Sequence, residues 1–292
     1  MEGLCGGVAA GLAILVVNPI DVIKSRIQMQ GELGAGKRVY TGIFSGLTTV
    51  ARNEGMKALY KGIAPAIMFQ MVGNGTRFGV YYAGKQYVGV DKALDSRTNF
   101  MLALTAGGLA GLIACPFFTL KTQLQVQTGA GGDLAVGHQH SHRGVVDAAQ
   151  TILREQGVAG LYAGLPAFFL RCTALVAAQM TTYDWAKQNL LDRTSLSNGP
   201  TCHVVSSAIA AGAACVCMQP FDLIGARMMN QPKAGDSGRL YKGPFDCFKK
   251  ILETEGPMGF YKGVTANYVR MGPQYILTFV FYEKLMSIYK SR

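Results

Sequence analysis

The chain has few charged residues for its length. Lys, Arg, Asp and Glu make up 15% of its 292 residues, whereas soluble domains carry about 25%. The mean hydropathy is correspondingly positive, at +0.20. This length would suggest about two soluble domains, but so little charge leaves two such domains without a polar coat. The composition therefore favours a membrane protein.

Acidic residues are scarcer than basic ones. Asp and Glu number 17 against 28 Lys and Arg, so the formal net charge is +11. Such a surplus attracts an anionic partner, which can be a substrate, a lipid surface or a nucleic acid. A nucleic-acid-binding protein gathers its basic residues on one face, whereas several arginines here interrupt apolar stretches. We therefore expect an anionic substrate and no nucleic acid.

Several kinds of motif are missing. The seven cysteines form no closely spaced framework, which argues against a secreted disulfide scaffold. The first four residues lack a basic stretch, so we expect neither a signal peptide nor a basic presequence. The sequence contains no glycine-rich phosphate loop, H-E-x-x-H or G-x-S-x-G. We expect no enzyme, and no catalytic residue, cofactor or metal.

Apolar stretches of two kinds alternate along the chain. Three charge-free stretches are long enough to cross a bilayer: 3–20, 98–120 and 194–221. Three more, each with one arginine (Arg77, Arg171 or Arg270), lie at 63–88, 165–190 and 264–289. An arginine inside a membrane normally faces a bundle interior or a water-filled cavity. We predict six transmembrane helices and regard the three arginines as candidate functional residues.

The chain repeats itself three times. Three sets of glycines recur with spacings of 102 and 99 residues: Gly42, Gly144 and Gly243; Gly55, Gly157 and Gly256; Gly62, Gly164 and Gly263. Recurrence at a fixed period indicates an array of similar units. We assign the repeats to residues 1–96, 97–197 and 198–292.

Each charge-free stretch carries a proline and, eight residues before it, a glycine. The prolines are Pro19, Pro116 and Pro220, and the glycines are Gly11, Gly108 and Gly212. Proline kinks a helix, and glycine lets helices approach closely in lipid. Three kinked and three arginine-bearing helices in threefold repeat predict an all-α pseudo-threefold barrel around a central path.

Two motifs in each repeat resemble those of the mitochondrial carrier family. The family's P-x-[DE]-x-x-[KR] reads PIDVIK at 19–24, PFFTLK at 116–121 and PFDLIG at 220–225. Its [DE]-G-x-x-x-x-[FYW]-[KR]-G reads EGMKALYKG, QGVAGLYAG and EGPMGFYKG downstream. The resemblance implies a multi-pass, monomeric carrier of the mitochondrial inner membrane with short matrix helices. It also implies both termini on the intermembrane-space side and bound cardiolipin.

In this family, the charges of the first motif pair between neighbouring repeats and close the matrix end of the cavity. Carried over to this chain, the pairing joins Asp21 with Lys121 and Asp222 with Lys24. The third pair would be Phe118 with Gly225, so both of its charges are absent together. Losing one partner of a buried ion pair is costly, whereas losing both is often neutral.

Further residues match the family's other gate elements. Gln28 and Gln125 match the braces beneath the matrix gate. The cytoplasmic gate of the family is [FY]-[DE]-x-x-[KR], here YYAGK at 81–85, YDWAK at 183–187 and YEKLM at 282–286. The same logic pairs Lys85 with Asp184 and Lys187 with Glu283.

The central site is predicted from the alignment of the arginine-bearing helices. One layer contains Phe69, Arg171 and Arg270, and a second contains Arg77, Gln179 and Thr278. Arg171 and Arg270 fall at substrate-contacting positions of the family, and Cys172 follows Arg171. A guanidinium suits bidentate binding of a carboxylate or sulfate. We predict substrate contacts from Arg77, Arg171, Cys172, Gln179 and Arg270; alternatively, Arg77 is structural or lipid-facing.

Segments after the first, third and fifth helices look like the oxaloacetate carrier branch. That branch implies transport of small dicarboxylates (oxaloacetate, malate, malonate) or of sulfate or thiosulfate. The alternative is a carrier of another anion, such as a nucleotide or phosphate, or a proton-leak carrier.

A five-residue insertion in the second repeat coincides with His138-x-His140-x-His142. Alternate histidines can bind a metal, but in a glycine-rich insertion they more often mark a flexible loop.

Overall fold

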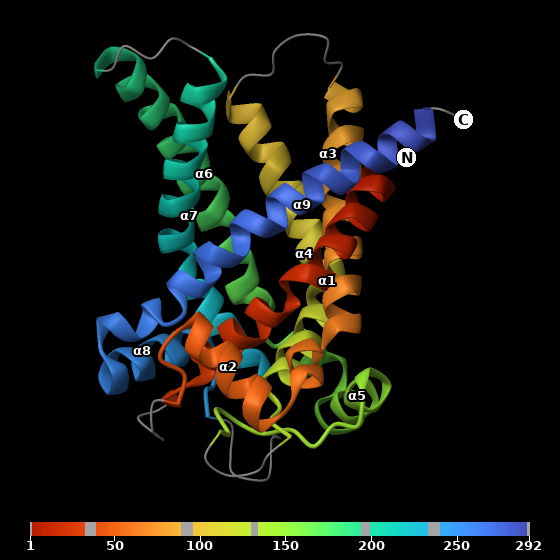
Figure 1. Ribbon diagram of the computed structural model, residues 1–292, viewed down its shortest axis with the longest axis vertical. Helices are drawn as coiled ribbons and strands as arrows, with labels where there is room; N and C mark the ends of the chain where they lie inside the picture. The colour runs from red at the N-terminus through yellow and green to blue at the C-terminus, as the bar shows by residue number, and fades with distance from the viewer. Residues whose placement is uncertain are drawn as a thin grey trace.

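The computed structural model describes residues 2–32, 39–88, 96–129, 134–193, 199–232 and 240–290. Six long helices contact one another in a closed ring, in chain order, with the last helix returning to the first (Figure 1). These helices are α1 (Glu2–Met29), α3 (Ile63–Val88), α4 (Ser96–Val126), α6 (Leu165–Arg193), α7 (Pro200–Met229) and α9 (Val264–Lys290). The predicted all-α barrel is therefore confirmed.

Shorter helices gather at one end of the ring, the lower end in Figure 1. They are α2 (Ile43–Asn53), η2 (Met56–Tyr60), α5 (Val145–Leu161), α8 (Pro244–Glu255) and η3 (Pro257–Tyr261). Gly55, Gly157 and Gly256 adopt positive φ values between 67° and 83° where these helices break. Only glycine takes up such a conformation readily, which explains why this position carries glycine in all three repeats.

The long helices differ in apolar character. Among the described residues, three helical spans are long and apolar enough to count as membrane spans on composition alone: Cys5–Met29, Thr98–Val126 and Thr201–Met229. They belong to α1, α4 and α7, the helices predicted from charge-free stretches. Helices α3, α6 and α9 have similar lengths but carry polar residues into the interior of the ring.

The prolines lie inside α1, α4 and α7, and the residue before each proline bonds to the connector of its own repeat. Asn18 donates to the Leu59 carbonyl at 2.9 Å and Gln219 to the Lys262 carbonyl at 2.7 Å. Cys115 Sγ lies 3.6 Å from the Leu161 carbonyl. Each kinked helix is thereby tied to the short helices beside it.

The glycines before the prolines allow close packing in two of the three repeats. A Cβ added at Gly11 would lie 2.8 Å from Met71, and one at Gly108 would lie 3.0 Å from Phe169. At Gly212 the nearest side chain, Tyr268, is 3.8 Å away, an ordinary contact distance. The expected close approach therefore fails in the third repeat, where the neighbouring helix stands further off.

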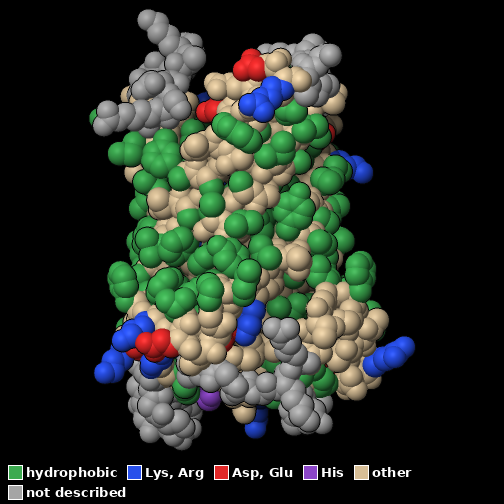
Figure 2. All heavy atoms as spheres, turned by 90° about the vertical axis from the view of Figure 1, so that its left-hand side faces the viewer, with side chains coloured by type: hydrophobic (Ala, Val, Ile, Leu, Met, Phe, Trp, Pro, Cys, Tyr) green, Lys and Arg blue, Asp and Glu red, His purple; other side chains and the backbone are tan. Residues whose placement is uncertain are grey.

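The outer surface fits a bilayer. Figure 2 shows hydrophobic side chains over the middle of the molecule and charged side chains toward its two ends. Outward-facing examples on α1 and α4 include Leu12, Val16, Leu109 and Ile113, which are 39–59% exposed. Lipid can cover this apolar belt, whereas water would leave it unfavourably exposed.

Candidate functional site

The ring encloses a cavity of about 600 Å³ that is lined by all six long helices. It extends from Asp21 and Asp222 to Tyr82 and Tyr282, which belong to the two predicted gates. The cavity therefore spans the interval between them.

Ion pairs form the floor of this cavity. Lys121 Nζ lies 2.8 Å from Asp21 Oδ2, and Lys24 Nζ lies 2.6 Å from Asp222 Oδ2. These are the two pairs expected from the family's motif, and each joins neighbouring repeats. All four side chains are buried, so these contacts are weakly screened by solvent.

Only one of the two glutamine braces contacts a floor pair. Gln28 Nε2 donates to Asp222 Oδ2 at 3.0 Å, as expected. Gln125 instead donates to Asn18 Oδ1 at 3.2 Å and accepts a bond from Ser25 at 2.9 Å. Its side-chain contacts tie α4 to α1.

Two of the predicted substrate arginines also contact the floor aspartates. Arg171 Nε lies 3.1 Å from Asp222 Oδ1, and Arg270 Nε lies 3.2 Å from Asp21 Oδ1. Each aspartate is thus shared by one lysine and one arginine. The sequence alignment placed the arginines in a layer but gave no register between the two kinds of helix, so this sharing was missed.

The position of a third such unit, between the first and second repeats, is occupied by aromatic side chains. The rings of Phe69 and Phe118 stack with centroids 5.0 Å apart, and Phe168 meets both rings edge-on at 6.2 and 5.9 Å. Phe69 occupies the position of Arg171 and Arg270 in the alignment. We call Phe69, Phe118 and Phe168 the aromatic unit.

The other predicted substrate residues differ in their placement. Arg77 and Cys172 line the cavity. The Arg77 guanidinium lies 5.5 Å from the centroid of Phe78. Gln179 is exposed and is not among the described residues that line the cavity. On α6 the lining ends at Val176, whereas on α9 it continues to Tyr282, so the wall is uneven at the level of Gln179.

Cationic side chains exceed carboxylates in the described lining of the cavity. The cations are Lys24, Arg77, Lys121, Arg171 and Arg270, and the carboxylates are Asp21 and Asp222. A surplus of positive charge in a low-dielectric cleft concentrates anions. Because guanidinium groups bind carboxylates in a bidentate manner, the floor is suited to a carboxylate with more than one charge.

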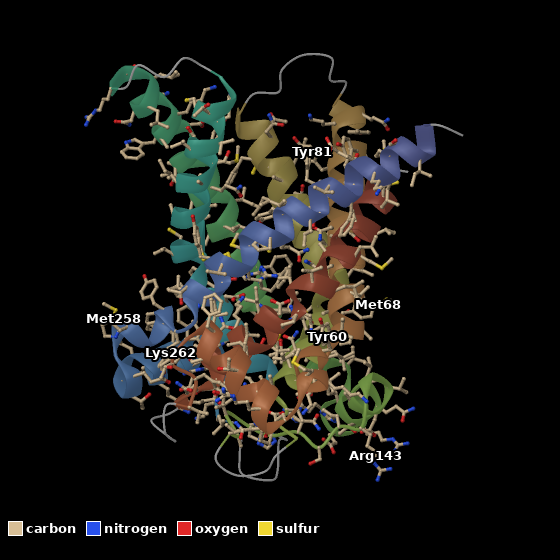
Figure 3. All side chains as sticks on the ribbon, viewed as in Figure 1. Tyr60, Met68, Tyr81, Arg143, Met258 and Lys262 are labelled. Carbon is tan, nitrogen blue, oxygen red and sulfur yellow. The ribbon has the colours of Figure 1, made fainter. Side chains whose placement is uncertain are left out.

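The second predicted gate is not assembled in this conformation. Within the described part of the chain, Lys85, Asp184, Lys187 and Glu283 form no ion pair with one another. Lys85 Nζ instead lies 5.2 Å from the Tyr81 ring. Tyr81 is at the end of the bundle opposite Tyr60 and Lys262 (Figure 3). The cavity reaches this end, which keeps the four side chains apart.

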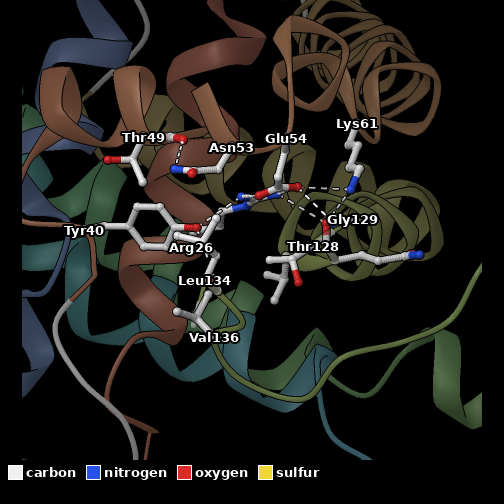
Figure 4. A network of polar contacts seen from close by, with 12 residues as sticks. Arg26, Tyr40, Thr49, Asn53, Glu54, Lys61, Thr128, Gly129, Leu134 and Val136 are labelled. Carbon is white, nitrogen blue, oxygen red and sulfur yellow. Dashed lines mark hydrogen bonds and ion pairs between the residues drawn. The ribbon is translucent and has the colours of Figure 1, made fainter. Parts of the chain in front are cut away.

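Below the floor, the repeats are joined by a second charged network that the sequence analysis did not identify. Arg26 pairs with Glu54, whose Oε2 also accepts bonds from Lys61 Nζ at 3.3 Å and Gly129 N at 3.0 Å (Figure 4). Arg26 and Lys61 donate to the Gln127 carbonyl at 3.2 and 3.0 Å. The network holds the end of α4 against the first repeat.

These partners keep the Glu54 carboxylate ionised by lowering its pKa. Burial raises the pKa of Glu54. The hydrogen bonds from Arg26 and the Gly129 amide and the nearby cations together lower it by more, so its pKa lies below the ordinary 4.5. The third repeat has the same network, in which Arg227 and Lys262 pair with Glu255. Arg227 and Lys262 donate to the carbonyls of Gln28 and Gln30 at 3.4 and 3.0 Å.

In the second repeat this network is neutral. Gln123 stands where the other repeats have Arg26 and Arg227, and it donates to the Met229 carbonyl at 2.9 Å. Its Oε1 lies 3.0 Å from His142 Nε2. Gln156 and Ala163 occupy the positions of Glu54 and Lys61. The seam between the second and third repeats therefore lacks these charges as well as a lysine–aspartate pair at the floor, although Arg171 and Asp222 meet across it.

The three histidines of the insertion pack against one another. The rings of His138 and His140 lie 4.6 Å apart, and those of His140 and His142 stack at 5.1 Å. Among the described residues, no group of three or more His, Cys, Asp or Glu side chains is placed to hold a metal ion.

The chain is similar to known proteins over nearly its whole length. A family model described as "Mitochondrial carrier protein" matches residues 1–92, 93–194 and 197–292. The chain is 35% identical to the mitochondrial citrate transporter E of Aspergillus niger, over 98% of this chain and 92% of that protein. It is 33% identical to the mitochondrial oxaloacetate transport protein of Saccharomyces cerevisiae, over 98% and 88% of the two chains. It is 34% identical to the mitochondrial 2-oxoglutarate/malate carrier protein of Caenorhabditis elegans, over 97% and 91%.

Proposed function

Because the chain belongs to the mitochondrial carrier family, whose members are transporters and not enzymes, we propose that it carries a small carboxylate with two or more negative charges. The surplus of cations around Arg171 and Arg270 at the cavity floor is the observation that carries this proposal. The names of the relatives agree with it, since they include citrate, oxaloacetate and 2-oxoglutarate/malate carriers. Oxaloacetate and malate are our first candidates.

The shared aspartates suggest how binding is linked to opening of the floor. Asp222 contacts both Lys24 and Arg171, and Asp21 contacts both Lys121 and Arg270. A substrate carboxylate that binds either arginine competes with the aspartate for it. The aspartate then holds its lysine alone, so the closed floor becomes less stable when substrate is present. A ligand shifts a conformational equilibrium by such a difference in affinity.

Closure of the opposite end completes the cycle. In our proposal Lys85 pairs with Asp184, and Lys187 with Glu283, once the floor has opened. Each gate then contains two lysine–carboxylate pairs, so neither state is much more stable than the other. A carrier that alternates its access around a central site needs this balance.

We further propose that the protein lies in the mitochondrial inner membrane, as a monomer with bound cardiolipin, and exchanges its substrates. The short helices α2, α5 and α8 would face the matrix, with both termini in the intermembrane space. Accessibility of terminal epitope tags in mitochondria with a ruptured outer membrane tests this orientation, since a matrix location would leave the tags protected.

Transport by the purified protein in liposomes tests the function. Labelled oxaloacetate, malate, citrate, 2-oxoglutarate, sulfate, phosphate and ADP would be offered to the wild type. The variants are Arg171→Ala and, as a matched control, Arg154→Ala, which removes an exposed arginine from α5. We expect carboxylate uptake by the wild type and the control but not by Arg171→Ala. Uptake of ADP, phosphate or sulfate alone, or proton conductance alone, would contradict the proposal.

A further inference from the structure

The lining of the cavity departs from threefold symmetry, because aromatic side chains gather on one side of it. Charged side chains of α1, α7 and α9, including Asp21, Lys24, Asp222 and Arg270, form one side of the lining. On α3, α4 and α6 the lining holds the cations Arg77, Lys121 and Arg171 but also the aromatic unit, with Leu175 and Val176 nearby. A threefold scaffold does not require this asymmetry of the lining. We therefore relate the asymmetry to the shape and chemistry of the ligand.

The aromatic unit leaves apolar surface uncovered. Phe69 and Phe118 are only half-buried although they stack on each other, and both line the cavity. Apolar surface in contact with water is unfavourable in proportion to its area. A ligand with its own apolar surface would cover these rings.

The rings also lie beside the cation that would hold the ligand. The Arg171 guanidinium carbon is 5.2 Å from the centroid of Phe168 and 5.9 Å from that of Phe118. Lys121 Nζ is 5.9 Å from the centroid of Phe69. A carboxylate bound to Arg171 therefore brings its attached carbon atoms next to the aromatic unit.

We propose that the aromatic unit is an apolar subsite that binds the carbon chain or alkyl substituent of the substrate. This inference rests on the proposed function and narrows its substrate class. The site selects dicarboxylates with an apolar substituent over carbon-free dianions such as sulfate. Phe69 is the specificity-determining residue, because its aligned counterparts Arg171 and Arg270 are cationic.

A series of dianions with constant carboxylate spacing tests the subsite. Malonate, methylmalonate and ethylmalonate differ only in the alkyl arm, and sulfate has no carbon. Each would compete with labelled malonate for uptake into liposomes that contain the wild-type protein. Each buried carbon should lower the half-inhibitory concentration roughly three- to fourfold, and sulfate should compete least.

Two substitutions separate the subsite from a packing role. Phe69→Ala should flatten the malonate series, whereas Phe69→Leu, which stays apolar and keeps more of the packing volume, should retain part of the gain. Phe279→Ala is the matched control: Phe279 lines the cavity on α9, is 61% exposed and lies outside the aromatic unit. It should leave the slope of the series unchanged.

The outcomes distinguish this inference from the proposed function. If the wild type accepts no carboxylate at all, the proposed function fails. If it transports carboxylates but shows no gain along the alkyl series, the subsite is overturned and the function stands. If Phe69→Ala and Phe69→Leu slow uptake of all anions by one factor and keep the slope, the aromatic unit is only a packing element and the inference is again overturned.

Discussion

The ring of Phe69 stacks on the ring of Phe118. In the alignment of the repeats, these two residues correspond to Arg171 and Asp222, which form an ion pair. A lysine completes each charged unit, and the residue that aligns with these lysines in the third repeat is Gly225. One entire arginine–aspartate–lysine unit is thus replaced by apolar groups. Because a single buried charge left without its partner costs about 3–5 kcal/mol, replacing all three together avoids that penalty.

Exchange of Asp21 and Lys121 tests the pairing of the floor. Each single reversal places like charges within a 2.8 Å contact, so we expect both to abolish uptake and lower the melting temperature. The double exchange restores the pair. It also places a lysine beside Arg270, whose partner in the wild type is Asp21. We therefore expect partial recovery only. Equal loss of uptake in all three variants would argue against the pairing.

The two cavity arginines should act on different steps of transport. Arg171 contacts the floor, whereas Arg77 is exposed within the cavity. Arg171→Gln should reduce maximal uptake strongly, because it removes both a substrate contact and a partner of Asp222. Arg77→Gln should mainly raise the half-saturating concentration, with an effect that weakens at high salt because exposed charges are screened. The same salt dependence in both variants would contradict this division.

Glu54 should be far more important for stability than its counterpart in the second repeat. Glu54→Gln leaves Arg26 buried without its carboxylate, a loss of about 3–5 kcal/mol, and should lower the melting temperature. Gln156→Ala is the matched control and should have little effect, because that repeat lacks both cations. Equal shifts in melting temperature would show that the charged network does not hold the repeats together.

The same carboxylate predicts a pH dependence. The pKa of Glu54 in the folded protein lies below its ordinary 4.5. Its stabilising contribution is therefore present above that value and lost as the pH falls through the lowered pKa. Between pH 7 and pH 4, the difference in melting temperature between the wild type and Glu54→Gln should narrow toward the acid end. A difference that does not change with pH would exclude this ionisation as the cause.

The fold was predictable because the repeats constrain one another. The glycine spacing fixed the alignment, and charge-free stretches located α1, α4 and α7. Predicted apolar ranges at 63–88 and 165–190 differ little from α3 and α6. The proline-containing helices extend beyond the predicted charge-free stretches; α1, for example, continues to Met29. They do so because the polar residues after each proline face the interior of the ring.

The sequence predicted contacts in the site only between helices of the same kind. The two floor pairs followed from the family's motif. Contacts between different kinds of helix, such as Arg270 with Asp21, depend on a vertical register that no spacing along the chain reveals. Gln179 lies outside the described lining of the cavity, and the alignment could not show this because it treats the wall as threefold symmetric. The contact between Gln123 and His142 could have been found by extending the alignment, because these residues stand where the first repeat has Arg26 and Tyr40, which are hydrogen-bonded to each other.

Restoring the missing charged unit gives the sharpest test of the whole arrangement. The triple variant Phe69→Arg, Phe118→Asp, Gly225→Lys would give the floor a third arginine–aspartate–lysine unit. A Cβ at Gly225 would meet only Ala167, at 3.4 Å, so the first atom of a side chain fits there. We expect the triple variant to melt higher than each single variant. It should also transport more slowly than the wild type, because a stronger floor opens less often.

The single variants serve as its controls. Phe69→Arg and Gly225→Lys each add a cation without a new carboxylate and should lower the melting temperature. Phe118→Asp should lower it least, because Arg171 lies 5.9 Å from that position and can approach the new carboxylate. Side chains in one network show coupled effects, whereas independent sites add. A triple variant whose change in stability equals the sum of the three single changes would show that the aromatic unit does not occupy the place of a third ion pair.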